Sequence, residues 1–550
     1  MSLIFIPSLL SWSFKKPSIQ AGIISNIKGI NPQQNTVAKQ IFFVSIWGSI
    51  KKKEIIKKLQ GTMGYRNLLI TILCTLFLNG MAFAHDAAAE NDDITDYTEA
   101  ITLVEVWLDA MQKFDRLPGI SAIALKDQEV IWKGAYGQAN PETGLAMSVN
   151  TICSVCSISK LFTSVAIMKL YEDGLLRLDD KIADLLPEYN LAQQYELSGP
   201  ITIRHLLTHS SGLPRENAWP HWTDPAQNFP TKEEILEKLN EQQTLYPSST
   251  YFQYSNLAMA LLGFVVEEIS GQEYNDFIQE HILSPLGLDD TRPDMPAELW
   301  GSQLAVGHSF ETMDGRQVKL EMFQPNGVIP AAGFSSTVED LADFAAWQFR
   351  LYEADKEEIL HPSTIKNMHN IHWMDSDFGT SWGLGFSVYK GPDGKKWVGH
   401  GGHCPGYKSS LAMIPETKMA YSVMMNSSNP NPGKYVHGMH AILSKAGEIK
   451  PEKNADLAAE LQEYAGYYEE DVLRSTIYVG TWGDKLMMMR LPSANPGEFN
   501  TFRRIDKDHF VRIRDNGADG ESMRFIRNED GEIVQMKYYD NYISVKLARD

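Results

Sequence analysis

Residues 153–170 of the chain read CSVCSISKLFTSVAIMKL, and we expect the rest of the sequence to be organised around this stretch. Ser157 and Lys160 stand three residues apart, which places them about one turn apart on the same face of a helix. The residues after Lys160 are apolar on nearly every side, and this pattern predicts a buried helix. An unpaired ammonium is costly in a protein interior, so its pKa falls there. We therefore predict that Ser157 is a nucleophile and Lys160 a candidate base.

Composition narrows the class of protein. The chain has 550 residues, of which 43% are hydrophobic and 10% aromatic, which indicates a globular protein. Its net charge is -19, and residues 85–550 are more acidic still, because residues 1–62 hold nine lysines and one acid. So acidic a body argues against binding to nucleic acid or to an anionic membrane surface.

Residues 63–84 have the pattern of a secretory signal peptide. Arg66 precedes the apolar run 68–78, and Ala82-Phe83-Ala84 supplies a small-x-small cleavage site. We predict translation from Met63, with residues 1–62 as an upstream extension, and a mature protein that is periplasmic or secreted. The signal is too short to remain as a stable membrane span. The alternative is a basic N-terminal tail with a signal-anchor.

The cysteines and several histidines raise alternatives that we disfavour. Cys153 and Cys156 could form a redox pair, but they abut a buried helix, so we interpret them and Cys404 as small buried residues. His205 and His209 have zinc-ligand spacing without the glutamate of the metalloprotease motif. Residues 400–404 hold two histidines and a cysteine without a fourth ligand at a suitable spacing. We expect neither a metal nor a cofactor.

The periodicity along the chain predicts an α+β protein. An amphipathic helix is expected at 96–114, followed by a hairpin of strands 120–125 and 130–136. Strands between residues 382 and 426 are expected to join this hairpin in one antiparallel sheet. A capping box at 336–339 predicts the start of a helix. Further helices are expected at 201–214, 231–239, 257–269, 338–349 and 435–446.

The C-terminal part differs in pattern from the rest. Residues 448–460 form a charged linker, and residues 461–550 alternate short strands and turns with many aromatic side chains. This predicts a separate small all-β domain, either a barrel or a sandwich. We find no P-loop and no G-x-G-x-x-G in the sequence. There is no G-x-S-x-G elbow either, which argues against an α/β-hydrolase.

Three blocks in order resemble the penicillin-recognising serine hydrolases, on the branch of class C β-lactamases, DD-peptidases and related esterases. The blocks are Ser157-Ile158-Ser159-Lys160, Tyr254-Ser255-Asn256 and His400-Gly401-Gly402. The resemblance covers about residues 100–445. It implies a β-lactamase/transpeptidase-like fold over residues 85–447, in which an antiparallel sheet flanked by helices meets an all-helical lobe at the site.

The resemblance also implies a role for each residue. Ser157 would form an acyl-enzyme, with Lys160 keeping it activated. Tyr254, its phenol pKa lowered by Lys160, would exchange protons with the nucleophile and the leaving group. Asn256 would orient Lys160 and the substrate. The backbone N–H groups of Ser157 and His403 would form the oxyanion hole, and Gly401 and Gly402 would let the strand approach a substrate closely.

One departure from the family bears on the substrate. Where β-lactamases and penicillin-binding proteins have Lys-Thr-Gly, this chain has His400 and Gly401 before Gly402. An imidazole is a weaker carboxylate anchor at pH 7 than a lysine. We therefore expect an exported hydrolase of small-molecule or short peptide substrates, acting on peptides, amides or esters as D-amino-acid peptidases and esterases do. A class C-type β-lactamase is the first alternative, and a non-catalytic penicillin-binding-like sensor or binding protein is the second.

Overall fold

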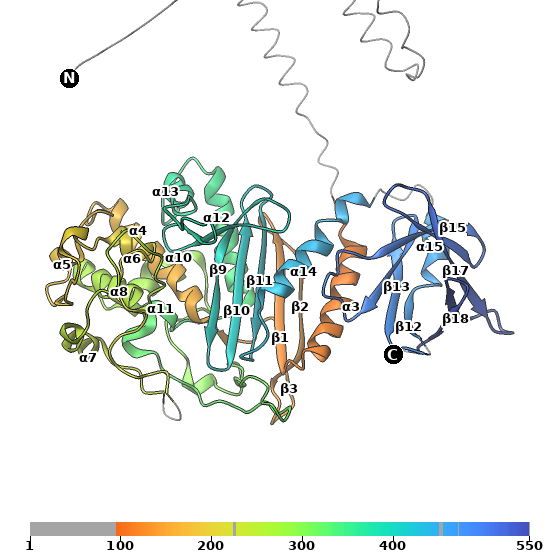
Figure 1. The fold of residues 1–550 in the computed structure, drawn as a ribbon, viewed down its shortest axis with the longest axis horizontal. Coiled ribbons are helices and arrows are strands. Elements are labelled where there is room, and N and C mark those ends of the chain that lie inside the picture. Colours follow the sequence, from red (N-terminus) through yellow and green to blue (C-terminus); the bar gives the residue numbers. More distant parts are fainter. Residues whose placement is uncertain (1–94, 224–226, 450–454, 471, 549–550) are drawn as a thin grey trace, which may run out of the picture. The chain divides into compact units, whose positions relative to one another are not determined.

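A nine-stranded antiparallel sheet lies at the centre of the part of the chain that precedes the C-terminal strands (Figure 1). Its strand order is β3-β2-β1-β11-β10-β9-β8-β7-β6. The predicted union of the early hairpin with the later strands is confirmed, since β1 pairs antiparallel with β11 and places Ile120 opposite Met425. The strands are β1 Gly119–Lys126, β2 Glu129–Asn140, β3 Leu145–Ala146, β6 Trp373–Met374, β7 Ser381–Trp382, β8 Ser387–Lys390, β9 Lys396–Cys404, β10 Tyr407–Ile414 and β11 Met419–Met425.

The sheet separates two hydrophobic cores. On β1, Ile123 and Leu125 point into the core that contains the helices of the helical lobe, whereas Ala122 and Ala124 point into the other. Side chains alternate across a strand, so a sheet covered on both faces buries nearly every residue of a central strand. The second core is covered by α3 (Thr98–Phe114) and α14 (Gly433–Leu443). Both helices lie close to the bounds that the sequence predicts.

The helical lobe is built around α4 (Ser159–Glu172) and α8 (Asn256–Ser270), which pack against each other and against α11 (Ile329–Ala332). Apart from Lys169 at its end, every residue of α4 up to Leu170 is buried, as its apolar pattern predicts. The other helices are α5 Ile182–Leu185, α6 Ile203–Leu207, α7 Lys232–Glu237, α9 Tyr274–Ile278, α10 Ser284–Leu286, α12 Val338–Glu353 and α13 Pro362–Met368. A π-helical turn, Gln279–Leu283, connects α9 to α10.

The C-terminal strands form a closed barrel, which decides between the two all-β architectures that the sequence allows. The barrel follows α15 (Ala455–Gln462) and has a core of its own that includes Leu461 and Phe510. It also contacts α3, since Trp107 Nε1 donates to Ser493 O at 2.8 Å. Its strands are β12 Gly466–Glu470, β13 Thr476–Trp482, β14 Lys485–Leu491, β15 Asn500–Asp506, β16 His509–Ile513, β17 Asp519–Arg527, β18 Ile533–Tyr538 and β19 Tyr542–Lys546.

The computed structural model describes residues 95–223, 227–449, 455–470 and 472–548. The predicted upstream extension and signal peptide, residues 1–62 and 63–84, lie outside these residues. Among the described helices, each is too short or too polar to cross a membrane. One local prediction is wrong by a residue: α12 is capped by Thr337, whose side chain accepts from Asp340 N, rather than by Ser336. Ser336 is instead paired in a short strand, β5 (Ser335–Ser336), against β4 (Cys153–Ser154).

Candidate active site

Ser157 lies in a tight turn between β4 and α4. The turn is a single 3-10 turn, Cys156–Ile158, so Ser157 precedes the α-helix on which the sequence placed it. Cys156 adopts a left-handed backbone with φ of 52°, a conformation that costs energy for a residue with a side chain. Between residues 151 and 168, Ser157 alone is partly exposed, so the turn leaves this residue accessible to solvent.

Lys160 is fully buried and directed at Ser157. Its Nζ lies 3.0 Å from Ser157 Oγ, 2.8 Å from Asn256 Oδ1 and 2.6 Å from Ala331 O. Burial lowers the pKa of Lys160 from 10.5 to about 7, although the Glu216 carboxylate opposes this shift. The predicted loss of basicity is confirmed in direction. Near neutral pH, this amine therefore exists in both its charged and its neutral form.

Asn256 is held in one orientation from behind. Its Nδ2 donates to Glu216 Oε1 at 2.6 Å, which turns its Oδ1 toward Lys160. Ser255 caps α8, with its Oγ accepting from Ala258 N at 2.9 Å, and so fixes the backbone at the entrance of the helix. The prediction that Asn256 lies beside Lys160 is confirmed, whereas the carboxylate behind it was not predicted.

Tyr254 lies beside both groups, with Lys160 Nζ 4.9 Å from the centroid of its ring. The expected lowering of its phenol pKa is wrong. Burial raises the pKa of Tyr254 above its ordinary value, and this effect exceeds the opposing ones of a hydrogen bond with Ser157 and of Arg215. The prediction left out the burial of the phenol itself, which is the largest influence on its pKa. Tyr254 is thus a neutral phenol that can donate and accept hydrogen bonds.

Two uncharged imidazoles flank Tyr254. Burial, together with the nearby Lys160, lowers the pKa of His400 to about 3, and its Nδ1 lies 2.6 Å from Gly401 O. Burial also holds the pKa of His209 well below its usual range. The His209 ring lies 4.4 Å from that of Tyr254, and its Nδ1 accepts from Ser255 N at 3.2 Å. His209 therefore supports the block around Tyr254, and His400 faces the site as a neutral group.

The glycines of the third block differ in their surroundings. A Cβ on Gly402 would lie 2.1 Å from Val155 O and 2.2 Å from Ser409 Oγ, both closer than atoms can pack. A Cβ on Gly401 would meet nothing nearer than Ser409 O at 3.8 Å. The absence of a side chain at Gly402 thus lets β9 lie directly against the turn that carries Ser157. The close approach of this strand to a substrate stays a prediction.

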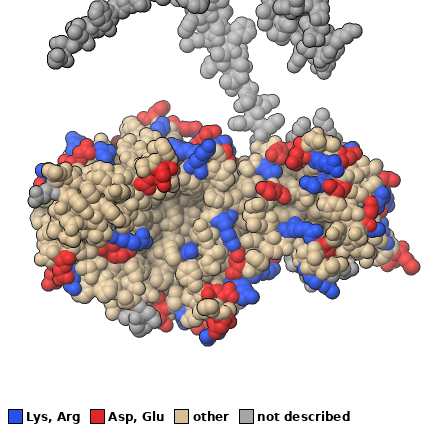
Figure 2. Space-filling model, viewed as in Figure 1, with Lys and Arg blue, Asp and Glu red and all other residues tan. Residues whose placement is uncertain are grey.

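The far end of β9 carries His403, whose side chain is exposed. Its ring makes an edge contact with Phe310 at 5.9 Å, and it is paired across the sheet with Lys408. The guanidinium of Arg215 lies 4.9 Å from the centre of the Tyr254 ring. Partial burial, together with Lys408 and Arg215, lowers the pKa of His403 below its ordinary value, so both basic side chains lie near the His403 ring. Figure 2 shows this face hollowed between β9 and the helices α8 and α11, with blue side chains at the rim.

Sequence reasoning missed Arg215 and Glu216, which follow the Ser-Gly turn after α6. Arg215 O accepts from Asn256 N at 2.7 Å, so the chain at this point is held against the start of α8. A charged pair placed directly after Leu213-Pro214 was the available signal, but no spacing rule connects residues 215–216 to residue 256. Only the fold brings the two segments together.

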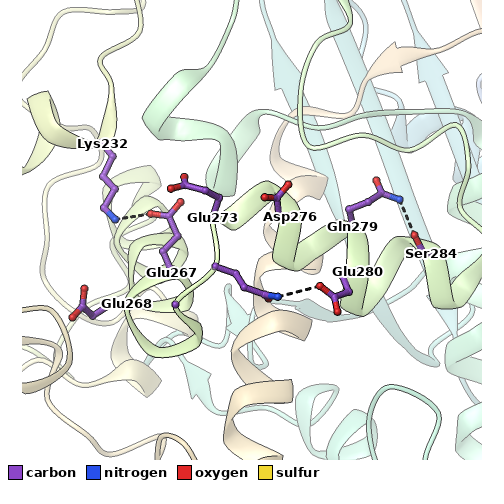
Figure 3. A pocket seen from close by; sticks show the side chains of 10 residues that line it. Lys232, Glu267, Glu268, Glu273, Asp276, Gln279, Glu280 and Ser284 are labelled. Atoms are coloured by element: carbon purple, nitrogen blue, oxygen red, sulfur yellow. Dashed lines mark hydrogen bonds and ion pairs between the residues drawn. The ribbon is translucent and has the colours of Figure 1, made fainter.

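A second hollow, of about 990 Å³, lies away from these residues (Figure 3). It is bordered by α8, α9 and the π-helical turn, and Lys232 Nζ pairs there with Glu267 Oε2 at 2.6 Å. None of the residues around Ser157 lines it. Its acidic lining offers no lysine-activated serine, and we do not assign it to the active site.

Cys153, Cys156 and Cys404 are free and buried, which confirms their interpretation as small buried residues. His205 has a structural role, because its Nδ1 accepts from Thr202 N at the start of α6 and its Nε2 contacts Ser249 Oγ at 2.7 Å. These partners account for both of its ring nitrogens.

A serine, a buried lysine and a tyrosine, located where a sheet meets a helical lobe, define a class of acyl-transferring serine hydrolases. The sequence profile of the Beta-lactamase family matches residues 107–443. The chain belongs to this family, and its C-terminal barrel lies outside the matched residues.

Known proteins similar to this chain come from different organisms. Beta-lactamase-like protein 2 of Dictyostelium discoideum is 26% identical over 328 residues, which make up 57% of this chain and 57% of that protein. The D-alanyl-D-alanine-carboxypeptidase/endopeptidase AmpH of Escherichia coli (strain K12) is 27% identical over 379 residues, 66% of this chain and 92% of that protein. The octameric penicillin-binding protein homologue from Pyrococcus abyssi superposes with a TM-score of 0.56 at 25% identity, covering 81% of this chain and 100% of that chain.

Proposed function

We propose that the protein is an exported serine hydrolase that forms an acyl-enzyme on Ser157 and hydrolyses small peptide, amide or ester substrates. The observation that carries this proposal is the set of three partners around Lys160 Nζ. Asn256 Oδ1 and Ala331 O can only accept hydrogen bonds, so they take both N–H groups of a neutral amine. The remaining lone pair faces the Ser157 hydroxyl and can accept its proton.

In the proposed acylation, the Ser157 proton passes to Lys160 Nζ while Oγ bonds to the substrate carbonyl carbon. The oxyanion that forms accepts from the backbone N–H groups of Ser157 and His403. As the intermediate collapses, the neutral Tyr254 phenol donates its proton to the leaving group and is reprotonated by the Lys160 ammonium. Water then attacks the ester in the reverse sequence of proton transfers, and the acid product and Ser157 are released.

D-amino-acid peptides and their amides are the substrate class that we favour, since AmpH, the similar Escherichia coli protein, is named for D-alanyl-D-alanine carboxypeptidase activity. β-Lactam hydrolysis is the second candidate, because the family and several relatives bear that name. The neutral state of His400 disfavours it, since the third block then offers no cation to a β-lactam carboxylate.

The test compares the mature protein with Ser157→Ala on a chromogenic cephalosporin, p-nitrophenyl esters and D-amino-acid amides. We expect turnover of the esters and amides to exceed that of the cephalosporin, and the variant to lose it. Intact-mass measurement should detect a covalent adduct on the wild type alone. Turnover that survives the substitution would exclude Ser157 as the nucleophile. The absence of both turnover and adduct with all three donors would favour the non-catalytic sensor instead.

A further inference from the structure

A buried carboxylate–imidazole contact lies behind Asn256, in the segment after α6. Glu216 Oε2 is 3.5 Å from His221 Nε2. Both atoms are buried, and neither has a hydrogen-bond partner among the residues that the structure describes. His221 is only 1% exposed and is packed against the rings of Trp222 and Phe229. Its surroundings on that side are therefore apolar.

The hydrogen bond of the other ring nitrogen of His221 determines which atoms of this contact can donate. Nδ1 lies 2.7 Å from Trp219 O, and a carbonyl oxygen can only accept, so Nδ1 carries a hydrogen. In a neutral imidazole, Nε2 would then be a lone pair facing a carboxylate oxygen. Two buried acceptors opposed in this way repel each other, whereas one proton between them makes a charge-assisted hydrogen bond.

We propose that Glu216 and His221 share one proton in a charge-assisted hydrogen bond and position Asn256 as a pair without net charge. This inference rests on the proposed function, because it makes both of them positioning residues for the acylation of Ser157. Glu216 Oε1 accepts from Asn256 Nδ2 at 2.6 Å, and Asn256 Oδ1 accepts from Lys160 at 2.8 Å. Two hydrogen bonds thus connect the pair to the lysine.

The charge of the pair bears on Lys160. An uncompensated carboxylate at this place would stabilise the ammonium and hinder proton transfer from Ser157. A protonated His221 cancels that charge from the buried side, and Arg215, whose Nε lies 3.3 Å from Glu216 Oε1, lessens it from the exposed side. The other titratable groups near Lys160 are Tyr254 before α8, His209 after α6, His400 on β9, and Cys156 and Cys404.

Three variants test the pair through the pH dependence of kcat/KM, measured on an ester that the wild type hydrolyses. His221→Phe removes the positive charge opposite Glu216. The pKa of the acid limb, which we assign to Lys160, should then rise by about one unit, the effect of a unit charge about 10 Å away at an effective dielectric constant of about 20. Glu216→Gln keeps an acceptor for Asn256 and allows His221 to lose its proton, so the limb should stay within about 0.3 units. The double variant should return to the wild-type value.

The opposite pattern would overturn the proposal: a limb lowered by Glu216→Gln together with an unchanged His221→Phe means that the carboxylate is uncompensated in the wild type. If Glu216 and His221 had a purely structural role, their substitution would lower kcat and leave the pKa of the acid limb unchanged in both single variants. His221→Gln retains a neutral donor to Glu216 and provides a milder replacement should phenylalanine prevent folding, and its limb should also rise.

A measurement on the unsubstituted protein does not depend on turnover. In ¹⁵N-histidine NMR at pH 7, both ring nitrogens of His221, assigned by their loss in His221→Gln, should carry protons. A bare Nε2 would refute the pair even in an active enzyme. Absence of turnover with both nitrogens protonated would refute the proposed function and leave the pair standing.

Discussion

Replacing Gly402 with alanine should separate β9 from the turn Cys156–Ile158, which carries Ser157. The added Cβ would lie 2.1 Å from Val155 O, a backbone atom two residues before Ser157. Relief of this clash requires a displacement of about 1 Å, and overpacking of this kind costs ~1–3 kcal/mol of stability. A shift of about 1 Å in a catalytic group lowers rates by roughly 100-fold. We therefore expect Gly402→Ala to lose activity far beyond its loss of stability.

Gly401→Ala is the matched control, because its Cβ has ordinary space. The two variants carry the same substitution at adjacent positions and therefore have the same composition. Thermal unfolding gives the stability cost, and the rate of covalent labelling of Ser157 by an activated ester gives the effect on the site. Equal labelling rates for the two variants would refute the argument that Gly402 sets the distance between β9 and Ser157.

Three further outcomes follow from the site. kcat/KM should rise with pH as Lys160 loses its proton, with a midpoint near its pKa of about 7. Lys160→Arg should abolish covalent labelling of Ser157, because a guanidinium keeps its proton. A labelled arginine variant would exclude the lysine as base. Because the folded-state pKa of Lys160 lies below its ordinary 10.5, the folded protein binds fewer protons than the unfolded chain above pH 7. The free energy of unfolding should therefore rise there by up to ~1.4 kcal/mol per pH unit. Urea titrations of the wild type and of Lys160→Met, in which this rise should be absent, check the prediction. Arg215→Gln should raise KM about 10-fold more for substrates with a carboxylate than for neutral esters, since the loss of its partial neutralisation of Glu216 affects both kinds of substrate alike; equal effects on both would assign Arg215 to its contacts with Tyr254 and Glu216.

The fold was predictable from the sequence where local pattern and burial agree. The all-apolar run after Lys160 can only be a buried helix, and the alternation around the turn at residues 126–128 can only be a hairpin. The turn that carries Ser157 was harder to predict. A three-residue spacing fits a 3-10 turn as well as an α-helix, and the left-handed backbone of Cys156 carries no sequence signal in a residue with a side chain.

Electrostatics were the least predictable part of the site. Deriving the pKa of Tyr254 from Lys160 alone gave the wrong direction, because burial acts on the phenol and on the lysine at the same time. Glu216 and His221 lie in a segment without recognisable periodicity, and their contact depends on how that segment folds over α8. Motifs identified the groups to which we assign the reaction, whereas the groups packed around them came from tertiary structure.

The second core of the sheet has a consequence for any attempt to shorten the protein. Trp107 and Leu108 of α3 share it with Tyr478, Trp482 and Met487 of the barrel, and Gly483 N donates to Glu99 at 2.6 Å. A protein truncated after α14 would expose this apolar surface to water and become prone to self-association. Residues 107–443 are the part that the chain shares with its family, and they leave out the barrel residues that cover this apolar surface. A minimal catalytic fragment would need its α3 surface redesigned with polar side chains.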